Sequence, residues 1–151
     1  MVGVCDWGGD VPPDLVLAGA ARSLAELVHG PYGDLATAEA GCLVAEGVRY
    51  LNYAAMHGGV TEPATVAACV GEMCTAAYRL PQLLSLLGDW VMAEAAAGRL
   101  GADDGQPGWQ LAESARAVLG EAMEHADALA RCLGVAHSLA STAHSTGPAA
   151  A

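Results

Sequence analysis

The feature that most constrains the fold of this chain is an apolar repeat between residues 66 and 91. Its members follow one another at alternating spacings of four and three: Val66, Val70, Met73, Ala77, Leu80, Leu84, Leu87 and Val91. This spacing is typical of a helix whose apolar seam faces another helix. The repeat passes through Pro81 without a change of phase, although a proline inside a helix costs about 3 kcal/mol. Two separate helices would not need to share a register, so we predict one long helix over residues 62–99, kinked at Pro81.

The rest of the chain also predicts helices, because no stretch alternates apolar and polar residues as a strand would. The predicted helices cover residues 13–29, from just after Asp34 to the His-Gly-Gly at 57–59, 62–99, and 109–143. Gly30 and Pro31 end the first helix, and Asp34 and Thr61 are the predicted N-caps of the second and third. Residues 101–108 form a loop rich in turn formers.

The last predicted helix carries a second apolar seam. Its members are Leu111, Ala115, Val118, Ala122, His125, Leu129, Cys132, Ala136 and Leu139, flanked by Leu119, Ala126, Leu133 and Ala140. Short loops favour antiparallel neighbours. We therefore predict an all-α protein, an antiparallel four-helix bundle with two long helices. One domain would span residues 1–146, followed by a disordered tail at 147–151.

Composition excludes several classes of protein. The net charge of −11 disfavours binding to nucleic acid or to an anionic membrane surface. No segment is apolar enough to cross a membrane, and the N-terminus does not resemble a signal peptide. The five cysteines are an odd number without metal-ligand spacing, and only Cys5 is expected to be exposed. A cytoplasmic location follows.

A second stripe on the helix after Asp34 is the first candidate site. Glu46, Tyr50, Tyr53 and His57 recur at spacings of four, three and four, opposite the aliphatic residues of the same helix. Tyrosine is enriched where one end of a side chain is apolar and the other is wet. Two interpretations remain open: the stripe contacts a partner or ligand, or Glu46 pairs with a neighbour and the tyrosines cover the ends of the bundle.

Four polar residues lie near the tyrosines along the chain, namely Arg49, Asn52, Arg79 and Gln82. A polar network between the second and third helices would satisfy the arginines. Enzymatic signatures are missing, since the sequence has no His-Glu-x-x-His, Gly-rich phosphate loop, G-x-S-x-G or Cys-x-x-Cys. We expect no catalytic residue, no metal site and no cofactor. His125 is interpreted as a core histidine.

The stretches VRYLN at 48–52 and YRLPQLL at 78–84, followed by Trp90, resemble a group of uncharacterised small helical proteins from Streptomyces and related actinobacteria. That group has no established activity, so the resemblance transfers no catalytic residue. It implies a bacterial cytoplasmic protein. It also makes six residues of the two stretches better candidates for a shared site, or equally for a shared packing contact: Arg49, Tyr50, Asn52, Arg79, Pro81 and Gln82.

Two functional hypotheses follow. The first is a non-enzymatic acidic bundle that acts through helix-face contacts, with itself as a homo-oligomer such as a dimer, or with another protein. The second is a binder of a small apolar ligand, in a pocket beside Pro81. The residues assigned to that pocket are Tyr50, Tyr53, Met73, Tyr78 and Trp90. Across both hypotheses the candidate residues are Arg49, Tyr50, Asn52, Tyr53, Tyr78, Arg79, Gln82 and Trp90.

Overall fold

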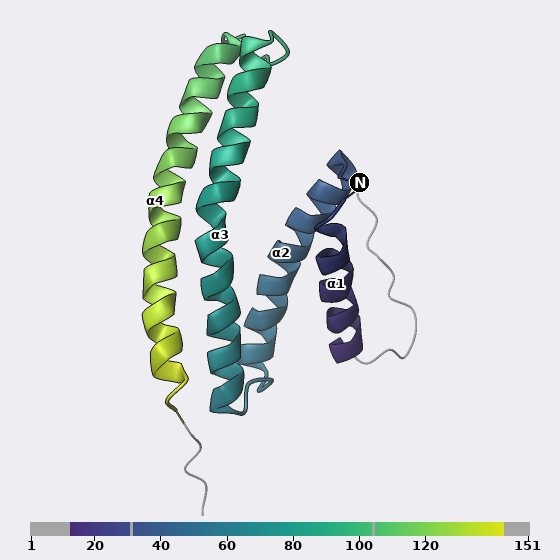
Figure 1. Cartoon of the computed structure of the whole chain (residues 1–151), viewed down its shortest axis with the longest axis vertical. Coiled ribbons are helices and arrows are strands. Elements are labelled where there is room, and N and C mark those ends of the chain that lie inside the picture. Colours follow the sequence, from purple (N-terminus) through teal and green to yellow (C-terminus); the bar gives the residue numbers. More distant parts are fainter. Residues whose placement is uncertain (1–12, 31, 104, 144–151) are drawn as a thin grey trace, which may run out of the picture. The chain divides into compact units, whose positions relative to one another are not determined.

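The computed structural model describes residues 13–30, 32–103 and 105–143, and within them every regular element is an α-helix. The four helices are α1 Pro13–Leu27, α2 Asp34–Met56, α3 Pro63–Ala96 and α4 Gly108–Ala140 (Figure 1). The predicted all-α class is confirmed. The predicted tail at 147–151 and Cys5 lie outside the described residues.

The chain divides into two units, Met1–Gly59 with α1 and α2, and Val60–Ala151 with α3 and α4. In the first unit α2 ends in a Schellman motif, because Gly58 takes a φ of 76° and the Gly59 N–H donates to the Ala54 carbonyl at 2.8 Å. The predicted N-cap Asp34 is wrong by one residue. Gly33 is the N-cap and its carbonyl accepts from the Thr37 N–H at 2.9 Å, so Asp34 is the first helical residue.

In the second unit α3 and α4 run antiparallel and pack along their lengths (Figure 1). α3 continues through Pro81 as a single helix with a gentle bend and no break, as the unbroken phase of its repeat predicts. Its N-cap is Glu62 and not the predicted Thr61, because Pro63 already occupies the first helical position.

The loop between the two long helices begins and ends with glycines. Gly98 has a φ of 69°, and the Arg99 N–H donates to the Glu94 carbonyl at 3.0 Å, which completes a Schellman motif at the end of α3. At the start of α4, a Cβ on Gly108 would collide with the carbonyl of Leu100. Only glycine therefore permits this tight return of the chain.

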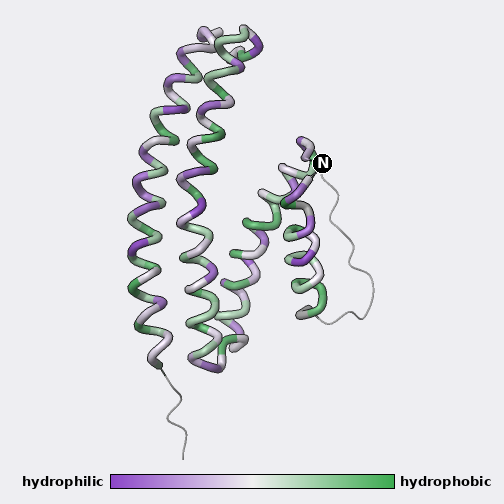
Figure 2. Tube along the Cα trace, in the orientation of Figure 1, coloured by the Kyte–Doolittle hydropathy of each residue, from purple (hydrophilic) through white to green (hydrophobic). Residues whose placement is uncertain are grey.

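The seam between α3 and α4 is made of small residues. Among the described residues the buried hydrophobic side chains are all alanines, at Ala77, Ala112, Ala126 and Ala130, and Gly88 is buried beside them. No large side chain is fully buried. Apolar positions recur along both helices in Figure 2, but most of the large ones point away from the seam. The two helices approach closely because alanine and glycine leave little between their backbones.

The seam differs from the predicted one on both helices. On α3, Val70, Ala77, Leu84 and Val91 are buried or half-buried as predicted, whereas the other members, Val66, Met73, Leu80 and Leu87, are exposed. In each case the next residue lies in the seam instead, for example Cys74 after Met73, Pro81 after Leu80 and Gly88 after Leu87. One residue turns a helix by about 100°, so the seam lies on the side of the smaller residues.

On α4 the same offset appears. The residues predicted only to flank the seam, Leu119, Ala126, Leu133 and Ala140, are buried or half-buried. Of the nine residues predicted as its centre, Ala115 and Ala122 are half-buried as predicted, and the other seven are exposed: Leu111, Val118, His125, Leu129, Cys132, Ala136 and Leu139. His125 is therefore not a core histidine, and Cys42 and Cys132 are exposed where only Cys5 was expected to be. Small side chains at the most buried positions, such as Ala126, let the backbones of α3 and α4 come closer.

Candidate functional site

The tyrosine stripe on α2 is exposed. Glu46 forms an ion pair with Arg49 at 2.9 Å, as one of the two interpretations predicts. The Tyr53 and His57 rings stack with centroids 6.0 Å apart, and the His57 ring donates through Nδ1 to the Tyr53 carbonyl at 2.8 Å. His57 thus closes the C-terminus of α2. These contacts all lie within one helix, and Tyr50 and Asn52 are exposed beside them.

The four candidates on α3 are exposed but do not share a face. By helical position Arg79 and Gln82, three residues apart, are neighbours, whereas Tyr78 and Trp90 point about 120° away from each other. Arg79 and Trp90 are eleven residues apart, about 16 Å along the helix. The described residues on α3 therefore do not gather the candidates into one constellation.

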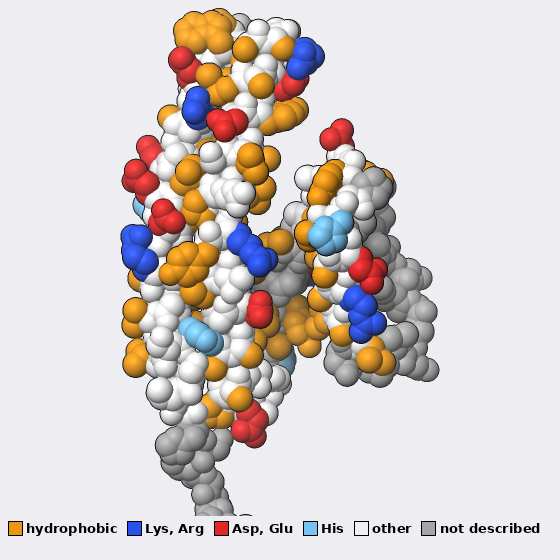
Figure 3. Space-filling view, viewed as in Figure 1, with side chains coloured by type: hydrophobic (Ala, Val, Ile, Leu, Met, Phe, Trp, Pro, Cys, Tyr) orange, Lys and Arg blue, Asp and Glu red, His pale blue; other side chains and the backbone are white. Residues whose placement is uncertain are grey.

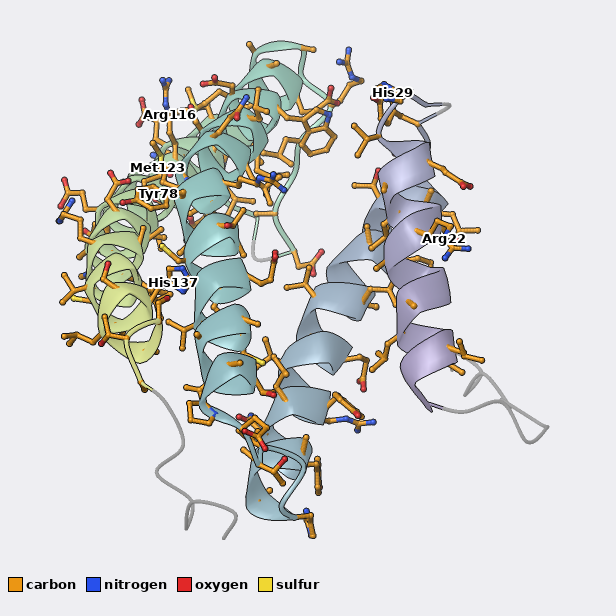
Figure 4. All side chains as sticks on the ribbon, turned by 60° about the horizontal axis from the view of Figure 1, so that its bottom comes forward. Arg22, His29, Tyr78, Arg116, Met123 and His137 are labelled. Atoms are coloured by element: carbon orange, nitrogen blue, oxygen red, sulfur yellow. The ribbon has the colours of Figure 1, made fainter. Side chains whose placement is uncertain are left out.

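One face of the hairpin carries Tyr78 from α3 with Arg116, Met123 and His137 from α4, which line one side of the pair in Figure 4. Arg116 pairs with Asp89 of α3 at 3.6 Å across this face. Over the part of α3 and α4 that Figure 3 presents, charged side chains lie among the hydrophobic ones. This face resembles an ordinary solvated surface.

Two polar contacts fix the seam itself. The His137 ring donates through Nδ1 to the Ala67 carbonyl at 2.9 Å, and the Cys74 thiol donates to the Ala130 carbonyl at 3.5 Å. Gly71 makes room for the imidazole, since a Cβ there would lie 2.9 Å from His137 Cε1. Both contacts set the register of α3 against α4.

The opposite face of the hairpin carries large exposed apolar side chains, and we name it the open apolar face. Its large members on α3 are Val66, Met73, Leu80, Leu83, Leu87 and Trp90. Its large members on α4 are Leu111, Val118, Leu129 and Leu139. Their exposure reaches 60% at Trp90, 64% at Val118 and 68% at Leu139.

Helical geometry places both rows on the same face. Each row repeats every seventh residue and precedes a seam residue by one position, as Leu87 precedes Gly88 on α3 and Val118 precedes Leu119 on α4. The offset has the same sense along both chains, and the helices are antiparallel, so the two rows emerge on one side of the pair. The Arg116–Asp89 ion pair sets the level, which puts Leu87 beside Val118.

Polar and charged side chains also lie on this side of the hairpin. His125 follows Val118 by seven residues and Glu121 follows it by three, so both lie near Val118 on α4, and both are exposed. Glu94 stands at the loop end of the face, and Arg99 binds that carboxylate with two hydrogen bonds, Nε to Oε2 at 2.8 Å and Nη2 to Oε1 at 2.7 Å. These hydrogen bonds lower the pKa of Glu94 below its ordinary value.

Other kinds of site find little support in the described part of the chain. It contains no cluster of three His, Cys, Asp or Glu side chains placed to bind a metal ion. None of its helices combines the length and the apolar character that crossing a membrane requires. A surface hollow of about 360 Å³ lies between the start of α3 and the end of α4, lined by Pro63, Val66 and Ala140 among others, far along the helix from Pro81.

Comparisons of the chain with protein-family models, with curated proteins and with solved structures found no match. Its site is therefore argued from geometry alone.

The sequence analysis singled out the aromatic and polar residues and missed the open apolar face. Its members were assigned to the core because they are the larger apolar residues. The signal that separates the two rows is residue size: alanine, glycine or proline follows Leu80, Leu87, Leu111 and Leu139 directly. Of the residues assigned to the predicted site or pocket, Met73 and Trp90 belong to this face.

Proposed function

We propose that this protein is a non-enzymatic helical scaffold that acts by docking its α3–α4 hairpin, through the open apolar face, onto another protein surface. The observation that carries the proposal is the contrast between a seam of alanines and an adjacent row of exposed leucines, valines and a tryptophan. Exposed apolar patches of this extent mark interaction sites in soluble proteins.

Energetics support the same conclusion. Burial of apolar surface is the main favourable term in folding, at roughly 25 cal/mol per Å². The seam buries alanines fully but leucines and valines only in part, so it gains less than a seam of fully buried leucines would, while each ordered residue costs roughly 1–2 kcal/mol in backbone entropy. The large side chains that would offset this cost lie on the open apolar face, so covering that face stabilises the hairpin.

The contact is helix against helix, because the face consists of two parallel rows with heptad spacing. Such rows accept apolar side chains of a facing helix at positions i, i+3, i+4 and i+7. The proposal needs no cofactor and no metal. A partner helix with apolar residues at those spacings and few acids facing the rows fits this chemistry.

Site-specific photo-crosslinking in the native host tests the proposal. A photoreactive phenylalanine derivative replaces Leu80, at the centre of the face, and as a matched control Tyr78, which is also exposed but points to the opposite face. We expect protein adducts from position 80 and few from position 78. Equal adduct yields at both positions, or none at position 80, would contradict the proposal.

The apolar-ligand alternative stays a prediction. Its proposed lining, however, combines Tyr78 with Met73 and Trp90, which lie on opposite faces of the hairpin, and no observation favours it over helix docking.

A further inference from the structure

We infer that the occupant of the open apolar face is a second copy of this chain, so that two α3–α4 hairpins pack face to face as a four-helix core. The inference rests on the proposed function and names the partner. Three properties of the face support it: its area, its pattern of residue sizes and the unpaired charges at its edges.

The area suits a stable dimer. α3 and α4 have 34 and 33 residues, which corresponds to about 50 Å of length. Two helices 8–10 Å apart present a face roughly 16 Å wide, or about 800 Å² in all. A standard protein interface buries about 800 Å² from each partner. The face is therefore large enough for a specific complex without help from other surfaces.

The pattern of residue sizes permits this arrangement. A twofold axis parallel to the helices lays α3 of one copy on α4 of the other at the same level. The register of the hairpin then sets Leu87 over Val118 and Leu80 over His125 in the middle of the face, and Trp90 over Ala115 and Leu83 over Ala122 of the second copy. The large residues thus meet in the middle of the interface, and alanines face Leu83 and Trp90.

The charges at the edges of the face agree with this arrangement. Among the described residues Arg79 on α3 has no ion-pair partner, and neither do Glu121 and Glu124 on α4. With the axis parallel to the helices, Arg79 comes within about five residues of the level of both glutamates of the second copy. Each edge of the dimer thus pairs one arginine with two acids, which reduces the repulsion between two acidic chains.

Light scattering coupled to size-exclusion chromatography on the full chain tests the inference. We expect a dimer at micromolar concentration. Leu80→Glu and Val118→Glu place a carboxylate in the middle of the interface and should each weaken dimerisation at least about 100-fold. Tyr78→Glu is the matched control, since it adds the same charge to an exposed site of the opposite face and should leave the dimer intact.

Cysteine crosslinking tests the direction of the axis. Leu83→Cys and Ala122→Cys are made separately in a chain whose natural cysteines are serines, then mixed and oxidised. We expect a disulfide between the two different variants in preference to one between identical chains. A preference for Leu83→Cys with itself would place α3 on α3 and overturn the arrangement.

The remaining outcomes separate this inference from the proposed function. A dimer that survives both Leu80→Glu and Val118→Glu uses another surface and overturns the inference. A strict monomer whose thermal midpoint Leu80→Glu leaves unchanged also overturns it, but the face is then free for a different protein and the proposed function stands. A strict monomer that Leu80→Glu destabilises and Tyr78→Glu does not has the face covered within its own chain, and both conclusions fall.

Discussion

The seam and the open apolar face of the α3–α4 hairpin lie about 100° apart on the same two helices, yet they have opposite compositions. The fully buried positions of the seam hold alanine and glycine, beside half-buried leucines, valines and Pro81, and the exposed face holds leucine, valine, methionine and tryptophan. Water reaches the more hydrophobic of the two. In this hairpin residue size, more than hydrophobicity, decides which side of a helix meets its first neighbour.

The reason is geometric. Small side chains let two backbones approach, which multiplies weak dispersion contacts along the whole seam. Large side chains hold backbones further apart and fill the wider space between a hairpin and a second layer. A helix with both rows is suited to contacts on two sides, a close one within the hairpin and a wider one beyond it.

The largest expected effect comes from exchanging the sizes of two adjacent residues on α4. Ala130 in the seam is 0% exposed and Leu129 on the face is 48% exposed. Ala130→Leu overpacks the seam and should lower the free energy of unfolding by as much as about 3 kcal/mol. Leu129→Ala should change it by less than about 1 kcal/mol, because water already reaches that side chain.

Urea denaturation followed by circular dichroism measures both variants in a Leu80→Glu background, so that association does not contribute. The opposite ranking, with Leu129→Ala the more damaging, would mean that the larger row is the true seam and would remove the contrast between the two regions.

Pro81 gives a second way to probe the seam. It is half-buried there and has no N–H, so the Ala77 carbonyl lacks its helical donor. Pro81→Ala restores that hydrogen bond and removes the clash of the ring with the Ala77 carbonyl, together worth about 3 kcal/mol, and loses up to about 1 kcal/mol of unfolded-state restriction. We expect a net stabilisation of roughly 2 kcal/mol by urea denaturation. A destabilised variant would show instead that the pyrrolidine ring and the bend it causes are needed for packing against α4.

Much of this architecture could be predicted from the sequence. The long helices were expected at 62–99 and 109–143 and lie at 63–96 and 108–140, and the phase through Pro81 correctly indicated one helix. The starts of the two long helices shifted by one residue and their ends by three, and Pro63 beside Glu62 explains the start of α3.

The side of each helix that forms the seam could not be predicted, because every helix carries two neighbouring rows. Leu80 and Leu87 continue a spacing of four and three, and so do the residues that follow them, Pro81 and Gly88. Hydrophobicity alone favours the larger residue of each pair. The choice depends on the partner helix, whose alanines at 112, 126 and 130 accept a close neighbour. The same ambiguity affected the candidate site. Residues that the repeat assigned to the core were not considered as part of an exposed binding surface.

Two glycines on α3 make a matched test of how tightly the seam is packed. A Cβ on Gly88 would lie 3.6 Å from Leu119 Cδ1, an ordinary contact, whereas one on Gly71 would lie 2.9 Å from His137 Cε1. Each alanine gains about 1 kcal/mol of helix propensity. Gly71→Ala should lose about that much again, because the imidazole must leave the Ala67 carbonyl.

The free energy of unfolding of Gly88→Ala is therefore expected to exceed that of Gly71→Ala by about 1 kcal/mol. Urea denaturation of the two variants measures this difference. In a His137→Ala background the two substitutions should become equivalent, which a double-mutant cycle detects. Should the gap persist without the imidazole, the close approach at Gly71 has another cause.

The smallest expected effect concerns the one acid at the end of the open apolar face. Hydrogen bonds from Arg99 lower the pKa of the Glu94 carboxyl from its ordinary value of 4.5, so the ionised form is favoured in the folded chain. A lowered folded-state pKa means that the unfolded chain binds the proton more readily. The contribution to stability is thus present above about pH 4.5 and is lost as the pH falls through the folded-state pKa. Because Arg99 is largely exposed, we expect a change of only a degree or two in thermal midpoint.

The measurement is the difference in thermal midpoint between the wild type and Glu94→Gln from pH 7 to pH 3, with Glu113→Gln, an exposed acid on α4, as the control. The difference for Glu94→Gln should narrow as the pH falls below 4.5 and through the lowered folded-state pKa. Arg99→Ala should reproduce that profile, since it removes the same two hydrogen bonds. A difference in thermal midpoint that stays constant with pH would show that Glu94 acts through packing at the edge of the face. The charge of its carboxylate would then not contribute to stability.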